Sequence, residues 1–249
     1  MIGILITARL GSTRLSQKHL IEVNDKTFIE WLVERFKTEF RKELSAGQMK
    51  IIIATSTKAE NTKFNELFKS NVVEVFHGSD QNIPLRHLEC ANINQLEYIL
   101  SVDGDDILCS PAASRLVLEK LKKDAPMVQT IGLPLGMNVM GYSTAFLSES
   151  LKNYDSATLE TGWGRIFDKN SIEFISLVGP EGGQNLRMTL DYQADASFFK
   201  TVISTIGSDI LQIKDKDLIE LILKNNWGRL NESMNDEYWT NFNAQKAQE

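Results

Sequence analysis

Cysteine is scarce in this chain, and long apolar runs are missing. The two cysteines, Cys90 and Cys109, are too few for a disulfide framework and form no Cys-x-x-Cys pair, so we expect reduced, buried thiols in a cytoplasmic protein. The apolar run at the N-terminus is short and lacks a preceding basic region, which argues against a signal peptide. No segment approaches the ~20 apolar residues of a membrane-spanning helix, so we expect no membrane partner.

Positive charge and histidine are also limited. The net charge of −6 argues against general binding to nucleic acid or to a membrane surface. The three histidines, His19, His77 and His87, are not spaced like the ligands of a metal cluster. Hydrophobic residues make up 42% and charged residues 24% of the 249 residues, which is typical of a globular protein and compatible with a single domain over 1–249.

Segments typical of strands and helices alternate along the first half of the chain. Short apolar runs predict buried strands, and apolar residues at helical spacing predict the helices between them. The expected strands are 2–6, 49–54, 72–76 and 95–102, and the expected helices are 26–40, 60–69, 83–93 and 110–123. This alternation predicts an α/β fold with a doubly wound, mostly parallel sheet.

The pattern changes after Asp124. Further strands are expected over 127–132, 141–146 and 171–178, without regular helices between them and with glycines separating them. We therefore expect a small, irregular, β-rich insertion over 124–187. The main sheet is expected to resume with a strand over 186–190 and helices over 195–203 and 215–224. The polar tail after Trp227 is expected to pack on the surface or to fray.

The opening of the chain carries a basic loop. The strand 2–6 runs into segment 7–15, which contains Arg9 and Arg14, is followed by Lys18 and has no acidic residue. Glycine lets the backbone approach an anion, and arginine grips phosphate oxygens in a fork. Ligands of open α/β sheets bind at the carboxyl ends of strands, so this loop predicts phosphate binding. The alternative is a plain basic surface loop, since the segment matches neither Gly-x-x-x-x-Gly-Lys-Ser/Thr nor Gly-x-Gly-x-x-Gly.

An acidic cluster follows the fourth expected strand. Asp103, Asp105 and Asp106 repel one another unless a cation lies among them. Mg²⁺ prefers one or two carboxylates together with phosphate oxygens, and Asp191, after a later expected strand, is a candidate second ligand for the same ion. The alternative is an acidic turn in which Asp105 or Asp106 caps a helix, with another turn at Asp191.

A basic loop and an acidic cluster at the same edge of a sheet match the needs of a nucleoside triphosphate with Mg²⁺. The loop holds the phosphates, and the metal neutralises charge at the reacting phosphate. The sequence shows no Ser-His-Asp pattern and no cysteine in a cationic setting, so it does not indicate a covalent nucleophile. Positioning and electrostatics are expected to carry the reaction.

The basic loop is the first of a series of short motifs. They are Ala8-Arg9-Leu10-Gly11-Ser12-Thr13-Arg14-Leu15-x-x-Lys18, Ile53-Ala54-Thr55-Ser56, Phe76-His77-Gly78-Ser79 with Arg86, Ser101-Val102-Asp103-Gly104-Asp105-Asp106, and Arg187-Met188-Thr189-Leu190-Asp191-Tyr192-x-x-Asp195. In this order they resemble the sugar-acid cytidylyltransferases, the acylneuraminate and CMP-Kdo synthetase type, and most of all the spore-coat polysaccharide branch. The resemblance implies a Rossmann-like nucleotidyltransferase fold, similar to the GT-A fold.

The resemblance also implies a reaction and a set of site residues. CMP is transferred from CTP to a sugar acid, pyrophosphate leaves, and the product serves surface-glycan synthesis. Arg14 and Lys18 hold the triphosphate, and Asp105 and Asp191 bind Mg²⁺. The implied nucleotide-binding residues are Ala8, Arg9, Gly11, Ser12, Thr13, Arg14, Lys18, Ala54, Thr55, Gly78, Ser79, Arg86 and Asp103. The family is usually homodimeric, so the insertion 124–187 is expected to form the subunit interface.

Some positions depart from the family pattern. Ser16-Gln17 replaces a common Pro-Gly, Ile107 stands where proline is common, and Gln193-Ala194 replaces Pro-Glu. Arg165 and Arg187 are candidates for holding a sugar carboxylate, with structural salt bridges as the alternative. These departures fit either an unusual acceptor or a relative that has lost activity.

Two other functions stay open at this point. Asp103-Gly104-Asp105 has the form of the Asp-x-Asp metal motif of nucleotide-sugar glycosyltransferases, although such enzymes have less need of the basic loop. The other alternative is a non-catalytic nucleotide-binding homologue. Release of pyrophosphate from CTP separates the cytidylyltransferase hypothesis from both.

Overall fold

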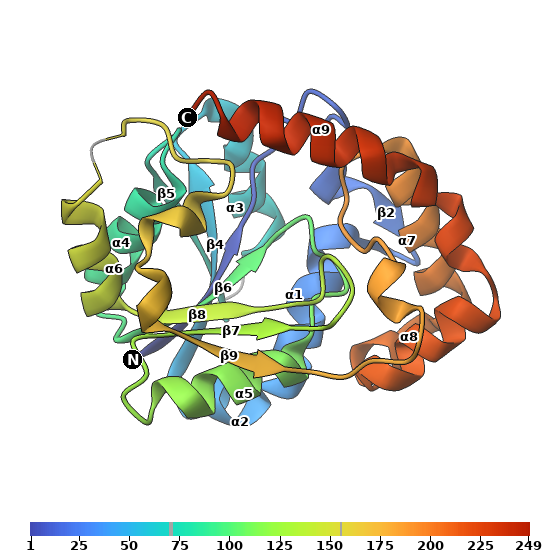
Figure 1. Ribbon diagram of the computed structural model, residues 1–249, viewed down its shortest axis with the longest axis horizontal. Coiled ribbons are helices and arrows are strands. Elements are labelled where there is room, and N and C mark those ends of the chain that lie inside the picture. The colour runs from blue at the N-terminus through green and yellow to red at the C-terminus, as the bar shows by residue number, and fades with distance from the viewer. Residues whose placement is uncertain (70–71, 155) are drawn as a thin grey trace.

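The computed structural model describes residues 1–69, 72–154 and 156–249. Within these residues a seven-stranded sheet forms the centre of the molecule, and a two-stranded ribbon lies beside it (Figure 1). The sheet contains β1 (Ile2–Thr7), β4 (Met49–Ser56), β5 (Val73–Gly78), β6 (Tyr98–Asp103), β7 (Met127–Ile131), β8 (Met140–Ser143) and β9 (Ile172–Ser176). The ribbon pairs β2 (Glu22–Val23) with β3 (Lys26–Thr27).

The strand order is β5-β4-β1-β6-β8-β7-β9. The strands β5, β4, β1 and β6 are parallel, and β9 is parallel to β7. The strand β8 runs antiparallel to both of its neighbours. The prediction of a mostly parallel α/β sheet is therefore confirmed, with β1 in its interior between β4 and β6, as expected for a strand that is buried on both faces.

Helices cover both faces of the sheet. They are α1 (Phe28–Glu39), α2 (Arg41–Ser45), α3 (Lys63–Leu67), α4 (Ile83–Asn94), α5 (Pro111–Leu121), α6 (Thr144–Lys152), α7 (Gln193–Ile206), α8 (Asp215–Lys224) and α9 (Asn235–Lys246). Local sequence sets several starts: Thr27 and Glu30 form a capping box before α1, and Ser110 caps α5 ahead of Pro111. No helix in the described part of the chain is both long and apolar enough to cross a membrane.

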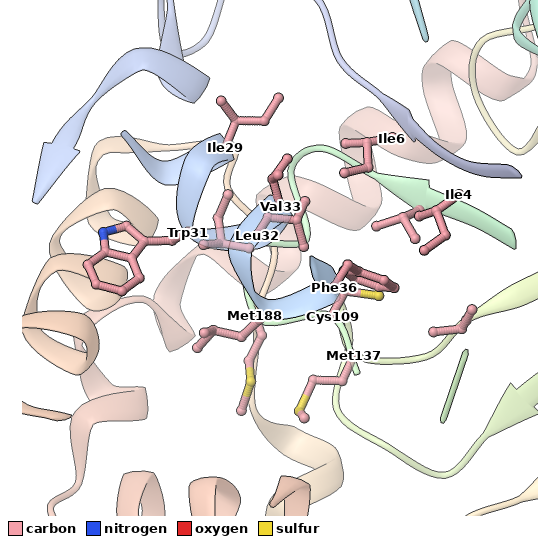
Figure 2. Close-up of a cluster of buried hydrophobic side chains, with 14 of the residues drawn as sticks. Ile4, Ile6, Ile29, Trp31, Leu32, Val33, Phe36, Cys109, Met137 and Met188 are labelled. Carbon is pink, nitrogen blue, oxygen red and sulfur yellow. The ribbon is translucent and has the colours of Figure 1, made fainter. Parts of the chain in front are cut away.

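Alternate residues of β1 enter two separate cores. Ile4 and Ile6 belong to the larger cluster, together with residues of α1, α5, α7 and α8. Figure 2 shows Val33 and Phe36 of α1 in this cluster, near Ile4 and Ile6. Leu5 belongs to the smaller cluster, with residues of α4 and α6. This alternation follows from the two-residue period of a strand and fixes β1 firmly between the layers.

The expected strand 141–146 is wrong after Ser143. The hydroxyl of Ser143 accepts a hydrogen bond from the Phe146 backbone N–H (3.1 Å) and caps α6, which begins at Thr144. The segment 124–187 thus contains a regular helix, contrary to expectation, and its strands β7, β8 and β9 extend the main sheet. Its expected role in a subunit interface stays a prediction.

The expected strand 186–190 is also wrong. Its backbone N–H groups bond to two different segments: Met188 donates to the Leu135 carbonyl (2.8 Å) and Leu190 to the Asp105 carbonyl (2.9 Å). It therefore crosses the sheet edge instead of pairing along a strand. The tail after Trp227 is not frayed, because it contains α9, which runs across the top of the view in Figure 1.

Candidate active site

A cleft of about 560 Å³ lies at the carboxyl edge of the parallel strands. Its walls come from the basic loop, the ends of β1 and β6, the segment 160–164, the segment before α7, and α9. The lining residues include Thr7, Ala8, Arg9, Gly11, Ser12, Thr13, Arg14, Lys18, His19, Arg86, Asp103, Asp105, Asp106, Glu160, Thr161, Gly162, Trp163, Asp191, Tyr238, Phe242 and Gln245. Most of the predicted phosphate-binding and metal-binding residues thus gather in one cavity.

Strand register brings the two charged segments together. Thr7 at the end of β1 lies opposite Ala54 on one side and Asp103 on the other. The Gly104 backbone N–H donates to the Thr7 carbonyl (2.8 Å), which ties the acidic turn to the start of the basic loop. A Cβ at Gly104 would lie 2.8 Å from that same carbonyl oxygen, so the approach requires glycine.

Asn61 holds the basic loop against the neighbouring strand end. Its side-chain oxygen accepts from the Leu10 backbone N–H (2.8 Å), and its amide nitrogen donates to the Ser56 hydroxyl (2.8 Å). Asn61 is fully buried. The backbone of the loop is therefore anchored from behind, which leaves the side chains of Arg9 and Arg14 at the cleft.

Lys18 joins the two aspartates that the sequence proposes as metal ligands. Its ammonium nitrogen lies 2.7 Å from Asp105 Oδ2 and 3.2 Å from Asp191 Oδ1. Arg14 Nη2 also contacts Asp191 Oδ1, at 2.8 Å. Asp105 and Asp191 are far apart in the chain, and their contact with one ammonium places both carboxylates at the same point of the cleft. The basic loop and the acidic cluster are therefore a single charged centre.

Burial and neighbouring charges set the protonation of this centre. Although burial favours the neutral acid, the charge of Lys18 and the contact with His19 hold the pKa of Asp105 well below its usual range. His19 Nε2 lies 2.9 Å from Asp105 Oδ1. Burial also opposes charge on Lys18, yet the carboxylates of Asp105 and Asp191 raise its pKa above the ordinary lysine value. The ion pair is therefore charged at neutral pH.

The pKa values of Asp103 and Asp106 are raised, in contrast to that of Asp105. The side chain of Asp103 opens to solvent within the cleft, but surrounding protein displaces much of its water. This desolvation and the charge of Asp105 raise the pKa of Asp103 to about 6. Desolvation and the charge of Asp103 raise the pKa of Asp106 well above its usual range. Within this cluster Asp105 is therefore the carboxylate held in its charged form beside Lys18, whereas Asp106 is shifted toward its neutral form.

The donor set suits a hard cation that is shared with a ligand. Two carboxylate oxygens, one from Asp105 and one from Asp191, contact the ammonium group of Lys18. Among the described residues no group of three or more His, Cys, Asp or Glu side chains is placed to hold a metal alone. Two carboxylates completed by phosphate oxygens match the preference of Mg²⁺. The residues present therefore fit Mg²⁺, which stays a prediction for this site.

A buried network fixes the position of Asp191. Arg187 Nη2 contacts Asp191 Oδ2 (3.1 Å), while Arg187 Nε bonds to Asp195 Oδ1 (2.9 Å). Asp195 also accepts from the backbone N–H groups of Asp191 and Tyr192, each at 2.9 Å. Asn231 Nδ2 completes the network on Asp195 Oδ1 (2.8 Å). Together these hydrogen bonds restrain the turn that carries Asp191.

The structure separates some predicted site residues from the cleft. Arg86 lies in the wall, but its guanidinium bonds to the carbonyls of Ser79 (2.7 Å) and Asp80 (2.9 Å). The described residues that line the cleft do not include Ala54, Thr55, Gly78 or Ser79. Their roles in nucleotide binding stay predictions, with Arg86 shaping the loop 79–80.

Neither of the two arginines proposed for a sugar carboxylate is among the described residues that line the cleft. Arg187 is fully buried, and its guanidinium carbon lies 4.4 Å from the ring centre of Tyr238. This places Arg187 in a structural role that orients Asp191. Arg165 Nε bonds to the Tyr154 hydroxyl (2.7 Å), and its Nη2 lies 3.7 Å from Glu249 Oε2. Arg165 therefore already faces a carboxylate.

Sequence reasoning missed the residues of α9. Tyr238, Phe242 and Gln245 line the cleft at helical spacing, in a tail that was expected to be merely polar. The spacing of these side chains within the tail was the available signal. Glu160, which forms an ion pair with Arg9, was also missed because the two residues are far apart in the sequence.

His87 and its partners lie beneath the end of β1. His87 Nε2 is 2.7 Å from the Thr7 hydroxyl, and His87 Nδ1 is 2.6 Å from the Tyr142 hydroxyl. Burial and the charge of Arg86 lower the pKa of His87 to about 3. His87 is therefore a neutral structural link that supports Thr7 at the cleft floor.

A basic loop that faces paired aspartates, at the carboxyl edge of an open α/β sheet, matches the needs of nucleotidyl transfer. Residues 3–161 match the cytidylyltransferase family by sequence profile. The chain therefore belongs to the cytidylyltransferase family and is a nucleotidyltransferase enzyme by that membership. The family prediction is confirmed, and the match favours it over the glycosyltransferase alternative.

Individual relatives and a solved structure are also similar to this chain. An uncharacterised protein of Methanocaldococcus jannaschii is 28% identical over 230 residues, covering 90% of this chain and 91% of the relative. A 3-deoxy-manno-octulosonate cytidylyltransferase of Elusimicrobium minutum is 29% identical over 125 residues, covering 49% of this chain and 46% of the relative. A solved cytidylyltransferase from Leptospira borgpetersenii serovar Hardjo-bovis has a TM-score of 0.78 at 23% identity, covering 92% and 97% of the two chains, which shows a shared fold.

Proposed function

We propose that this protein transfers CMP from CTP to a hydroxyl group of an acidic keto-sugar and releases pyrophosphate, for the synthesis of a surface glycan. The observation that carries the proposal is the contact of Lys18 with both Asp105 and Asp191, next to Arg14. Membership of the cytidylyltransferase family supports the transferred group. The choice of an acidic keto-sugar is supported by the similarity to 3-deoxy-manno-octulosonate cytidylyltransferases.

Arg14 and Lys18 bind the triphosphate in this proposal. Both cations now contact Asp191, and a triphosphate brings more negative charge than one carboxylate. The side chain of Arg14 is about one-third exposed and lines the cleft, where a phosphate can reach it. Lys18 is buried, so its ammonium reaches the phosphates from the floor of the cleft.

Asp105 and Asp191 would hold Mg²⁺ once phosphate oxygens share the positive charge of Lys18. The ion, when bound, neutralises charge on the reacting phosphate and favours departure of pyrophosphate. The chain itself holds both carboxylates in place, through Lys18 on one side and the Arg187–Asp195 network on the other. Preorganised charge of this kind requires little rearrangement during the reaction.

The chemical step is a direct displacement. The sugar hydroxyl oxygen forms a bond to the α-phosphorus of CTP, and the bond from that phosphorus to the oxygen bridging the β-phosphate breaks. Pyrophosphate leaves, and the hydroxyl proton passes to water. The contribution of the chain is to align the two reactants in the cleft and to compensate the charge on the phosphates.

The partners in the proposal are CTP, the sugar and a second copy of the chain. A homodimer that uses segment 124–187 follows from the family resemblance, and a cytoplasmic location follows from the two cysteines, which form no disulfide framework. Light scattering coupled to size-exclusion chromatography tests the dimer directly. A mass of one chain at micromolar concentration would reject it.

Pyrophosphate release tests the proposed function. Each of the four nucleoside triphosphates is mixed with Mg²⁺ and a panel of acidic and neutral sugars. We expect release only with CTP and a keto-acid sugar. CTP binding measured by calorimetry, together with no release across the panel, would favour the non-catalytic alternative. Release with another triphosphate, or with a neutral sugar alone, would contradict the proposal.

A further inference from the structure

The helix α9 covers the cleft instead of packing into the core. Tyr238, Phe242 and Gln245 line the cavity. Phe242 lies about one helical turn after Tyr238, and Gln245 about two turns after it. No residue of α9 is buried. In Figure 1 this helix runs across the molecule above the sheet. Contacts that hold α9 in place therefore control what else can occupy this side of the cleft.

The segment after α9 inserts a carboxylate into a small group of donors. Glu249 Oε2 accepts hydrogen bonds from the backbone N–H groups of Glu160 (2.9 Å) and Thr161 (2.7 Å). Arg165 Nη2 lies 3.7 Å from the same oxygen. The Glu249 side chain is only 10% exposed in this position. Two successive backbone donors and a guanidinium form a carboxylate-binding nest.

The nest borders the candidate active site. Glu160 and Thr161, which supply its backbone donors, both line the cleft. The side chain of Glu160 forms an ion pair with Arg9 of the basic loop. A carboxylate in the nest is therefore next to the wall that faces the phosphate-binding residues, on the side covered by α9.

Glu249 does not use all of the donors. Arg165 Nη2 is buried and makes no hydrogen bond among the residues that the structure describes. The rest of the guanidinium is fixed, because Nε bonds to the Tyr154 hydroxyl (2.7 Å) and Nη1 to the Thr161 carbonyl. A carboxylate placed closer to Arg165 Nη2 than that of Glu249, which lies 3.7 Å away, would gain this bond, and a buried unpaired donor is costly.

We propose that this nest binds the carboxylate of the acceptor, and that Glu249 is an internal competitor which the acceptor displaces. The identity of the ligand as a sugar acid rests on the proposed function. The nest itself requires only a carboxylate. Displacement of Glu249 also releases the end of α9 from the segment 160–161, which opens the side of the cleft lined by Phe242 and Gln245.

The size of the competition follows from tethering. A group held on the same chain acts at an effective concentration of about millimolar. For a nest that holds a free carboxylate with a Kd of about 0.1 mM, a tethered competitor at about 1 mM weakens external binding about tenfold, and removal of Glu249 is expected to restore that factor. The matched control is Glu237, an exposed glutamate on α9 whose removal changes the net charge equally.

The test uses pyruvate as the probe, because it is the smallest 2-keto carboxylate and does not depend on the identity of the sugar. Amide NMR resonances of Glu160 and Thr161 are followed during titration of wild type, Glu249→Ala and Glu237→Ala. We expect Glu249→Ala to bind pyruvate about tenfold more tightly than the other two. Methyl pyruvate, which lacks the charge, is expected to leave both resonances unchanged.

Equal affinities in the three proteins, or no response of these amides in Glu249→Ala, would overturn the proposal. Arg165→Gln provides a second variant, in which the loss of pyruvate binding is expected without a change in CTP binding. The pyrophosphate assay reports separately on the proposed function. With an accepted sugar acid, Glu249→Ala is expected to lower the KM for the sugar about tenfold and to leave the KM for CTP unchanged.

Discussion

Asp195→Asn is expected to destabilise the protein, because it replaces one buried, charged carboxylate by a neutral amide. Asp195 is fully buried and accepts hydrogen bonds on both oxygens. Oδ2 receives Arg187 Nη2 and the backbone N–H groups of Asp191 and Tyr192, while Oδ1 receives Arg187 Nε and Asn231 Nδ2. Asparagine has one side-chain oxygen, so its NH₂ group must face at least two donors in either orientation.

The magnitude follows from the charge that is left without a partner. Breaking a buried ion pair by removing one member costs about 3–5 kcal/mol. Arg187 keeps its contact with Asp191, at 3.1 Å, so we expect the lower value, about 3 kcal/mol. For a chain of this size that corresponds to a fall in Tm of about 10 °C.

Thermal and urea unfolding followed by circular dichroism measure this loss. Asp217→Asn is the matched control, because Asp217 is an exposed aspartate at the third position of α8, as Asp195 is at the third position of α7. We expect the control to change stability by less than about 0.5 kcal/mol. Equal stabilities of the two variants would refute the view that this network holds the Asp191 turn.

Three further predictions concern the reaction. Arg14→Ala is expected to raise the KM for CTP about tenfold or more, from loss of a charge-assisted bond to phosphate, and an unchanged KM in steady-state assays would reject the phosphate-loop assignment. Asp105→Asn is expected to lower kcat by about 10²-fold or more with little change in far-UV circular dichroism, and near-normal turnover would remove the metal assignment. Chelation with EDTA is expected to abolish pyrophosphate release and added Mg²⁺ to restore it, whereas activity that persists in EDTA would exclude a metal requirement.

The framework of the site could be predicted from local patterns. The apolar runs of β1, β4 and β6 identify buried parallel strands, and the polar residues that follow them must then meet at one edge of the sheet. The register confirms this for Thr7 and Asp103. Prediction fails where a local sequence is compatible with both a strand and a helix. The segment 141–146 was predicted to be a strand, but Ser143 caps α6, which begins at Thr144.

The pairing of side chains from distant segments depends on the folded chain. Lys18 lies between Asp105 and Asp191, and Glu249 binds the backbone of Glu160, only because packing brings these segments together. By itself the sequence determined the alternating elements, the basic loop and the family, since periodicity, caps and motifs act between near neighbours. Tertiary structure alone decided that Arg187 supports the site from behind and that α9 covers it, because burial depends on every element that packs nearby.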